Sequence, residues 1–170
     1  MSYIFIDLET GGLHSDLNPV LQIGAIATDD EFNILERFST FVRPNPDLIV
    51  EREALEINKI DLKSLDDAPG EALAMRNFNK FLTKYGHPDL LGFNIYFDLM
   101  FLTSICFRNK LHLEASGIFF DLKMLAHRVT DSYKYSLKST CEYLGIGFKP
   151  DHTALKDAEA CVEIAKKVLL

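Results

Sequence analysis

The sequence has 170 residues, 48% of them hydrophobic, and includes 13 phenylalanines. This size and apolar content fit one domain with a single buried core, so we expect residues 1–170 to form one domain. The formal net charge of −7 argues against the broad basic surface that binding of a long nucleic-acid duplex requires.

The first third of the chain predicts three β-strands. Residues 3–7 are apolar and β-rich and end at an acidic residue, and residues 20–28 form a second apolar run. A third strand is expected at 38–42, before Pro44 and Pro46. The connections have the length of turns, which favours an antiparallel arrangement of these strands.

Helices and strands alternate in the rest of the chain. Strands are expected at 90–93 and 117–121, and the later strands should run parallel to the first because helices join them. Helices are expected between Pro69 and Gly86, at 98–108, 122–129 and 137–144, and from 154 onward. The fold class is therefore α/β, with a mixed five-stranded sheet (three antiparallel strands, then parallel strands) flanked by helices.

Two acidic residues end the first strand. Side chains at i and i+2 of a strand point the same way, so Asp7 and Glu9 face one spot. Their like charges repel unless a cation lies between them. A polar strand end before a turn would give the same pattern. The glycines at 11 and 12 favour a ligand site, because glycine lets the backbone approach a ligand closely.

Two further segments carry acids, each with a simple structural explanation. Asp98 follows a strand at the start of a helix, where Asp is a common N-cap. Asp157 lies in the first turn of the last helix, where the helix dipole favours a carboxylate. That explanation does not account for His152, five residues earlier, or for the alanines that fill many positions around Asp157.

Together, and in this order, the segments resemble the three exonuclease motifs of the DnaQ-like family (DEDD superfamily, histidine subtype). This family contains the proofreading exonuclease subunit of bacterial replicative DNA polymerase. The segments read DLETGG, GFNIYFD and HTALKDA, and the resemblance covers roughly residues 3–168. Two positions within the motifs, both beside the site, depart from the family pattern: Gly11 stands where the family often has Thr, and Phe93 where it often has His. The resemblance implies a ribonuclease H-like fold.

The resemblance also implies the roles of the site residues. Asp7, Glu9, Asp98 and Asp157 would be catalytic carboxylates that bind two divalent cations, Mg²⁺ or Mn²⁺, since hard cations prefer oxygen ligands. His152 would be the general base, because histidine commonly accepts a proton near neutral pH. Four of the negative charges would then belong to the metal site, which leaves −3 on the rest of the chain.

The resemblance also implies substrate contacts beside these residues, in or directly after the first two motifs. The implied reaction is 3′→5′ hydrolysis of phosphodiester bonds at the 3′ ends of single-stranded or frayed DNA. The implied partners are nucleic-acid 3′ ends and a DNA polymerase or other replication protein. The expected substrate-binding residues are Thr10, Gly12, Leu13 and Asn94.

The sequence leaves two alternatives open. The first is an RNA-trimming 3′→5′ exoribonuclease of the same family, and the second is a partner-binding module that keeps the fold without catalysis. A family proofreading subunit carries a further C-terminal polymerase-binding segment, so this chain either works alone or is part of a longer one.

The apolar runs and the cysteines indicate in which cellular compartment the protein is expected. The apolar run at 3–6 is too short for a signal peptide, and no run reaches the ~20 residues of a membrane span. The three cysteines show no CxxC spacing and are expected to be buried free thiols. We therefore expect a cytoplasmic protein that has no membrane partner.

Overall fold

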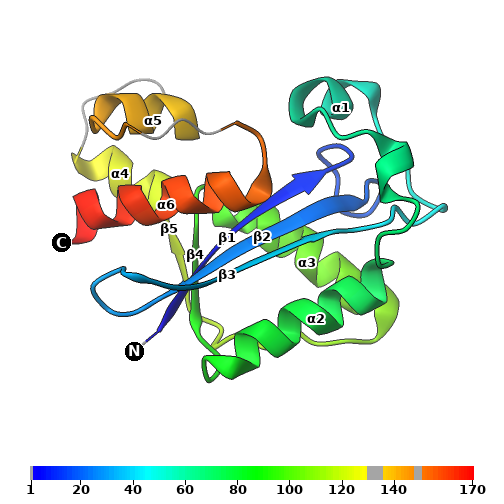
Figure 1. Ribbon diagram of the computed structural model, residues 1–170, viewed down its shortest axis with the longest axis horizontal. Coiled ribbons are helices and arrows are strands. Elements are labelled where there is room, and N and C mark those ends of the chain that lie inside the picture. Colours follow the sequence, from blue (N-terminus) through cyan, green and yellow to red (C-terminus); the bar gives the residue numbers. More distant parts are fainter. Residues whose placement is uncertain (1, 130–135, 148–150) are drawn as a thin grey trace.

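The computed structural model describes residues 2–129, 136–147 and 151–170. Within these ranges, five strands form one sheet in the order β3-β2-β1-β4-β5 (Figure 1). Neighbouring strands β1, β2 and β3 pair antiparallel, whereas β4 pairs parallel with both β1 and β5. The mixed sheet expected from the sequence is confirmed. The strands are β1 Tyr3–Thr10, β2 Val20–Thr28, β3 Ile34–Phe41, β4 Asp89–Gly92 and β5 Phe119–Asp121.

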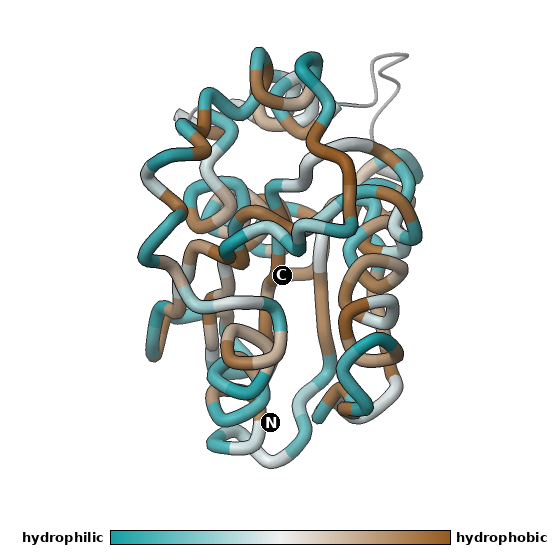
Figure 2. Tube along the Cα trace, turned by 90° about the vertical axis from the view of Figure 1, so that its right-hand side faces the viewer, coloured by the Kyte–Doolittle hydropathy of each residue, from teal (hydrophilic) through white to brown (hydrophobic). Residues whose placement is uncertain are grey.

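Helices cover both faces of the sheet. Helices α2 and α3 pack on one face, and α4, α5 and α6 pack on the other (Figure 1). Figure 2 shows hydrophobic stretches of the central strands enclosed between these helical layers. The helices are α1 Arg52–Asn58, the 3-10 helix η1 Leu62–Leu65, α2 Glu71–Lys84, α3 Ile95–Asn109, α4 Leu122–Val129, α5 Leu137–Tyr143 and α6 Ala154–Leu169.

Strand β1 is the centre of the molecule and is buried on both faces. Ile4, Ile6 and Leu8 contribute to the core beneath α2 and α3, whereas Phe5 contributes to the core beneath α6. This alternation follows from the two-residue period of a strand. Each fully buried side chain of this size contributes about 1.5–3 kcal/mol through removal of apolar surface from water. The two cores therefore fix β1, and any side chain on it, between the helical layers.

Three expected boundaries differ most from the structure, and two of them bear on the site. Strand β1 does not end at residue 7 but continues to Thr10, because its pairing with β2 extends to Val20 after a bulge. Helix α3 begins at Ile95 rather than at residue 98, because Asn94 adopts a left-handed conformation with φ of 65° and turns the chain directly into the helix. Strand β3 begins at Ile34 rather than at residue 38.

Candidate active site

Strand β1 holds Asp7 and Glu9 on the face that α6 covers. In the pairing with β2, Asp7 lies opposite Gly24 and Glu9 lies opposite Gln22. Phe5, two residues before Asp7, packs in the core beneath α6, so the two carboxylates share that side of the strand. Asp7 is partly buried and Glu9 is 8% exposed. The sequence prediction that these two side chains face the same side agrees with this register.

Helix α3 brings Asp98 to the same end of the sheet. Strand β4 runs parallel to β1, and the chain turns from Gly92 into α3 through the left-handed Asn94. The Asn94 backbone N–H donates to Oδ1 of Asp121 at 3.0 Å, which fixes this turn to the end of β5. Asp98 therefore lies in the first turn of α3, is 3% exposed, and is not the N-cap that the local sequence suggested.

Helix α6 supplies Asp157, and the turn before the helix supplies His152. Asp157 is in the first turn and is 7% exposed, whereas His152 is exposed and has φ of 60°. The helix start lies so close to β2 that a Cβ on Gly24 would stand 2.3 Å from the carbonyl carbon of Ala154. Glycine at this position therefore lets α6 approach the carboxylates of β1.

Three of the predicted residues form a compact group. Oxygens of Glu9 and Asp157 and a ring nitrogen of His152 all lie within 4.8 Å of one another. Among the described residues, this is the one group of three or more potential metal ligands with such spacing. Asp7 and Asp98 are outside that set. They nevertheless interact with it: besides burial, the charges of Asp98 and Asp157 raise the pKa of Asp7, and the charge of Asp98 also raises the pKa of Glu9. The structure thus brings all five residues to one end of the sheet.

Burial and mutual repulsion make these carboxylates hard to ionise. Burial, and then the charges of Asp157 and Asp98, raise the pKa of Glu9 to about 8. Burial raises the pKa of Asp157 to about 6, although His152 opposes this shift. The pKa values of Asp7 and Asp98 are also raised well above the usual range, in both cases chiefly by burial. Four such groups can all be ionised near neutral pH only if positive charge lies among them.

The donor set fits a divalent cation. Oδ1 of Asp157 is buried and accepts no hydrogen bond within the part of the chain that the structure describes. A buried carboxylate oxygen without a donor is costly, because it loses its hydration and gains no partner. Carboxylate oxygens are the ligands that Mg²⁺ and Mn²⁺ prefer. A bound cation would satisfy this oxygen and relieve the repulsion that raises the four pKa values.

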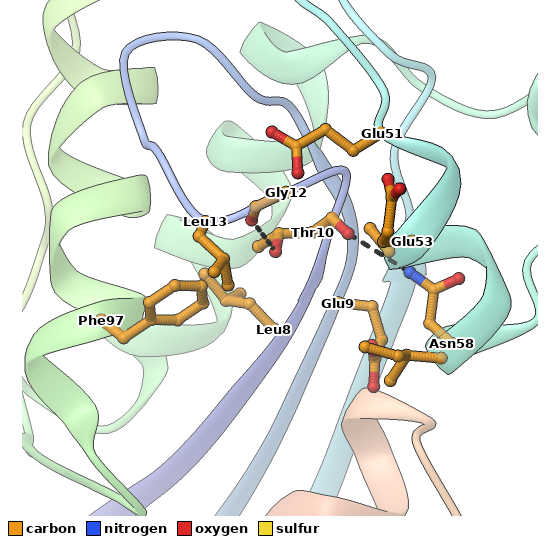
Figure 3. A pocket seen from close by; sticks show the side chains of 11 residues that line it. Leu8, Glu9, Thr10, Gly12, Leu13, Glu51, Glu53, Asn58 and Phe97 are labelled. Carbon is orange, nitrogen blue, oxygen red and sulfur yellow. Dashed lines mark hydrogen bonds between the residues drawn. The ribbon is translucent and has the colours of Figure 1, made fainter.

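A cleft of about 270 Å³ opens beside Glu9. Three of the four predicted substrate-binding residues line it: Thr10, Gly12 and Leu13. Leu13 is 71% exposed and lies near Phe97, whereas the Glu9 side chain points toward the start of α6 (Figure 3). The fourth predicted residue, Asn94, is exposed at the start of α3, where its backbone holds the turn described above.

Hydrogen bonds fix the backbone of this cleft. The Thr10 hydroxyl donates to the Gly12 carbonyl at 2.7 Å, and the Asn58 amide donates to the Thr10 carbonyl at 3.2 Å (Figure 3). Sequence reasoning missed Asn58, Ile57 and Phe97 as cleft residues. Phe97 lies inside a motif and could have been singled out. No local pattern marks Asn58 or Ile57, because α1 reaches the cleft only through tertiary packing.

Several other polar features lie outside the carboxylate cluster. Oδ1 of Asp121 accepts the backbone N–H groups of Asn94 and Lys123, at 3.0 and 2.9 Å. The three cysteines are buried free thiols, as expected. None of the helices within the described ranges is long and apolar enough to cross a membrane. The remaining histidines are all exposed: His14, His87, His112 and His127.

Comparison with known proteins identifies the family. An exonuclease family model, RNase T, matches residues 4–165, which is nearly the whole chain. The chain belongs to the exonuclease family. Its motif segments, from the end of β1 to the start of α6, all lie inside the matched range. The family resemblance inferred from the sequence motifs is thereby confirmed.

Relatives with similar sequences include DNA polymerase III proteins. The chain is 29% identical over 168 residues to a DNA polymerase III PolC-type protein of Caldanaerobacter subterraneus subsp. tengcongensis. The aligned region covers 98% of this chain and 11% of that protein. It is 26% identical to the DNA polymerase III subunit epsilon of Treponema pallidum, over 96% of this chain and 74% of that subunit. The chain thus spans about a tenth of the length of the PolC-type relatives.

Solved structures of exonuclease I have the same fold. One exonuclease I structure superposes with a TM-score of 0.88 at 24% identity, and covers 98% of this chain and 40% of that one. A zinc-bound complex of Escherichia coli exonuclease I with single-stranded DNA gives a TM-score of 0.87 at 25% identity, with the same coverage. The ribonuclease H-like fold that the resemblance implied is confirmed.

Proposed function

We propose that this chain is a 3′→5′ exonuclease that releases nucleoside monophosphates from the 3′ ends of single-stranded or frayed DNA. The observation that carries the proposal is the cluster of four carboxylates with raised pKa values at one end of the sheet, beside an exposed histidine. Such a cluster is unfavourable in a purely structural role, because burial and repulsion both oppose its ionisation. Membership of the exonuclease family supports the same function.

The carboxylates of this cluster would hold two divalent cations, Mg²⁺ or Mn²⁺. Two such cations supply charge stabilisation for both the attacking and the leaving oxygen of a phosphodiester. The burial of Glu9, Asp98 and Asp157 excludes water and strengthens that interaction. The metal ligands proposed are Asp7, Glu9, Asp98 and Asp157.

His152 is proposed as the general base. Its ring nitrogen lies within 4.8 Å of oxygens of Glu9 and Asp157, and its exposure lets it reach a water molecule at the edge of the cluster. A general base must come within hydrogen-bond reach of the proton that it accepts. His152 would take a proton from the attacking water, and nearby carboxylates would stabilise the imidazolium that forms.

The cleft beside Glu9 is proposed to hold the terminal nucleotide. Leu13 and Phe97 offer apolar surface to a base, and the backbone around Thr10 and Gly12 lies within reach of the sugar. DNA is favoured over RNA because the relatives are DNA polymerase III proteins and the solved exonuclease I complexes contain DNA oligonucleotides. The same relatives favour a DNA polymerase or other replication protein as a partner. In this proposal, residues 1–170 act as one exonuclease domain.

Digestion of matched DNA and RNA oligonucleotides, labelled at the 5′ end, tests the proposal. With Mg²⁺ or Mn²⁺ the wild-type protein should shorten the DNA from its 3′ end and release mononucleotides, whereas Asp7→Ala should release none. Faster shortening of the RNA would establish the exoribonuclease alternative. Absence of mononucleotides with either substrate and either metal would favour the non-catalytic alternative.

A further inference from the structure

A buried glutamine on β2 joins the two halves of the candidate site. Gln22 is 7% exposed and lies opposite Glu9 in the pairing of β2 with β1. Its side chain points to the same face of the sheet as Glu9, toward α6. Oε1 of Gln22 accepts the backbone N–H of Ala154, the first residue of α6, at 3.2 Å. Nε2 donates to the Ser39 hydroxyl at 3.4 Å.

This contact gives the first N–H group of α6 a partner. The first N–H groups of a helix have no partner within the helix, and a Ser or Thr at the N-cap commonly accepts one of them. Thr153 occupies the N-cap of α6 but makes no such bond. Its hydroxyl instead donates to Oδ1 of Asp151 at 2.7 Å. The partner of the helix start is therefore supplied by Gln22, from a strand that is 132 residues away in sequence.

The location of the contact gives it influence over the proposed chemistry. Ala154 lies two residues after His152 and three before Asp157, so a shift of the helix start moves both side chains relative to Glu9. Gln22, His152 and Thr153 also line a common cavity of about 210 Å³. His152 is also exposed, so burial of its own side chain does little to hold it in place if the Gln22 contact is lost.

We propose that Gln22 is a positioning residue, which sets His152 and Asp157 against Glu9 through its hydrogen bond to the start of α6. The inference rests on the exonuclease function proposed above and assigns Gln22 no contact with substrate. A metal site tolerates little displacement of its ligands, and loss of residues that orient ligands typically lowers metal affinity or activity by about 10–100-fold. A residue that merely capped α6 would affect stability alone.

Three variants separate positioning from stability. Gln22→Met conserves size but removes the acceptor, and Gln22→Glu keeps an acceptor for the Ala154 N–H. Ile23→Val is the matched control, because Ile23 is the next residue of β2 and packs in the opposite core, beneath α2 and α3. The measurements are kcat and KM on a DNA oligonucleotide, Mn²⁺ affinity by calorimetry, and the melting temperature.

We expect Gln22→Met to lower kcat by ~10-fold and to weaken Mn²⁺ binding by a similar factor, with KM nearly unchanged. Gln22→Glu should restore most of kcat and bind Mn²⁺ at least as tightly as the wild type. Ile23→Val should lower the melting temperature without either change. If Gln22→Met does not fold, Gln22→Asn, which shortens the side chain by one carbon, takes its place.

Two outcomes would overturn the inference. One is a Gln22→Met protein that behaves like Ile23→Val, with reduced melting temperature but wild-type kcat and Mn²⁺ affinity. The other is a Gln22→Glu protein that is as impaired as Gln22→Met. A wild-type protein without nuclease activity would contradict the proposed function instead. Calorimetry with Mn²⁺ would then still show whether Gln22 controls the geometry of the carboxylate cluster.

Discussion

At the scale of single residues, burial decides between a structural and a functional explanation of an acidic side chain. Asp98 and Asp157 could each be explained locally, as a helix cap and as a partner of the helix dipole. The structure removes the first explanation, because Asn94 is the N-cap of α3. It weakens the second, because Asp157 is 7% exposed and its Oδ1 has no hydrogen-bond donor among the described residues. The helix dipole contributes at most about 2 kcal/mol, which does not offset the cost of burying a carboxylate oxygen without a donor, so this burial points to a ligand.

The proposed base predicts a kinetic effect of removing one side chain. His152→Ala should lower kcat by ~10²–10⁴ with little change in KM, because the imidazole takes part in proton transfer rather than in substrate binding. The measurement is steady-state digestion of a DNA oligonucleotide. His87→Ala is the matched control, since His87 is also exposed but precedes the opposite, amino-terminal end of β4. A His152→Ala protein with near-wild-type kcat would remove the assignment.

The raised pKa of Glu9 predicts how stability depends on pH. Its pKa is about 8 in the folded protein, against an ordinary value of 4.5. The folded state therefore binds this proton more tightly than the unfolded state does. The corresponding stability is fully present below the ordinary value and is lost as pH rises through about 8. Metal-free protein should thus become less stable in mildly alkaline solution.

Glu9→Gln isolates this contribution, because the amide resembles the protonated acid and does not titrate. Without metal, the variant should be more stable than the wild type by about 1 kcal/mol or more at ~pH 9, and the difference should shrink toward ~pH 5. Urea unfolding in the presence of a chelator measures both free energies. A difference that does not vary with pH would contradict the assigned pKa.

Among the structural elements, the loop between β1 and β2 depends on an ion pair elsewhere in the fold. Nη2 of Arg108 lies 2.6 Å from Oε1 of Glu71, and Nη1 donates to the Ser15 carbonyl at 3.1 Å. The Ser104 hydroxyl also donates to the Ser15 hydroxyl, at 3.1 Å. Helices α2 and α3 therefore anchor the loop that carries Leu13, one wall of the proposed nucleotide cleft.

Removing Arg108 should destabilise the protein. Glu71 is 6% exposed, so Arg108→Ala leaves a buried carboxylate without its cation, and the free energy of unfolding should fall by about 3 kcal/mol. The freed loop should also raise KM, because Leu13 loses its fixed position. Arg52→Ala is the control: its ion pair with Glu56 is exposed and should contribute little. Urea unfolding curves that are equally displaced for both variants would contradict this view of the network.

Across the protein surface, charge limits how substrate can be held. The chain has 25 acidic and 18 basic residues, and Glu51 and Glu53 line the proposed nucleotide cleft. These features are unfavourable for a phosphate backbone and leave cations at the carboxylate cluster as the main attraction. Substrate binding should then involve few contacts between basic side chains and phosphates.

Salt dependence tests this expectation. The slope of log(kcat/KM) against log[salt] on single-stranded DNA should be smaller than about 2 in magnitude, since each phosphate contact to a single strand contributes roughly 0.7. The measurement uses a constant concentration of Mg²⁺ and a varied concentration of KCl. A slope of about 5 or more in magnitude would indicate an extended basic surface. It would contradict the proposal that the metal ions provide most of the attraction for the substrate.

Much of this molecule could be predicted from the sequence. Strand β2 occupies residues 20–28 and α4 occupies 122–129, as expected from the sequence. The strand directions also followed, because short connections favour antiparallel pairs and helical crossovers favour parallel ones. These features are determined locally, by hydrophobic period, turn residues and connection length. The order of the three motifs was enough to suggest the exonuclease family.

Only the tertiary structure decided how the site is assembled. The start of α3 depends on Asn94, whose left-handed conformation is held by Asp121 of β5. The start of α6 depends on Gln22 and on the close approach that Gly24 allows. In each case the partner is distant in sequence, so no local pattern could reveal it. The sequence by itself determined which groups carry the proposed chemistry. Long-range hydrogen bonds and packing decided where those groups meet.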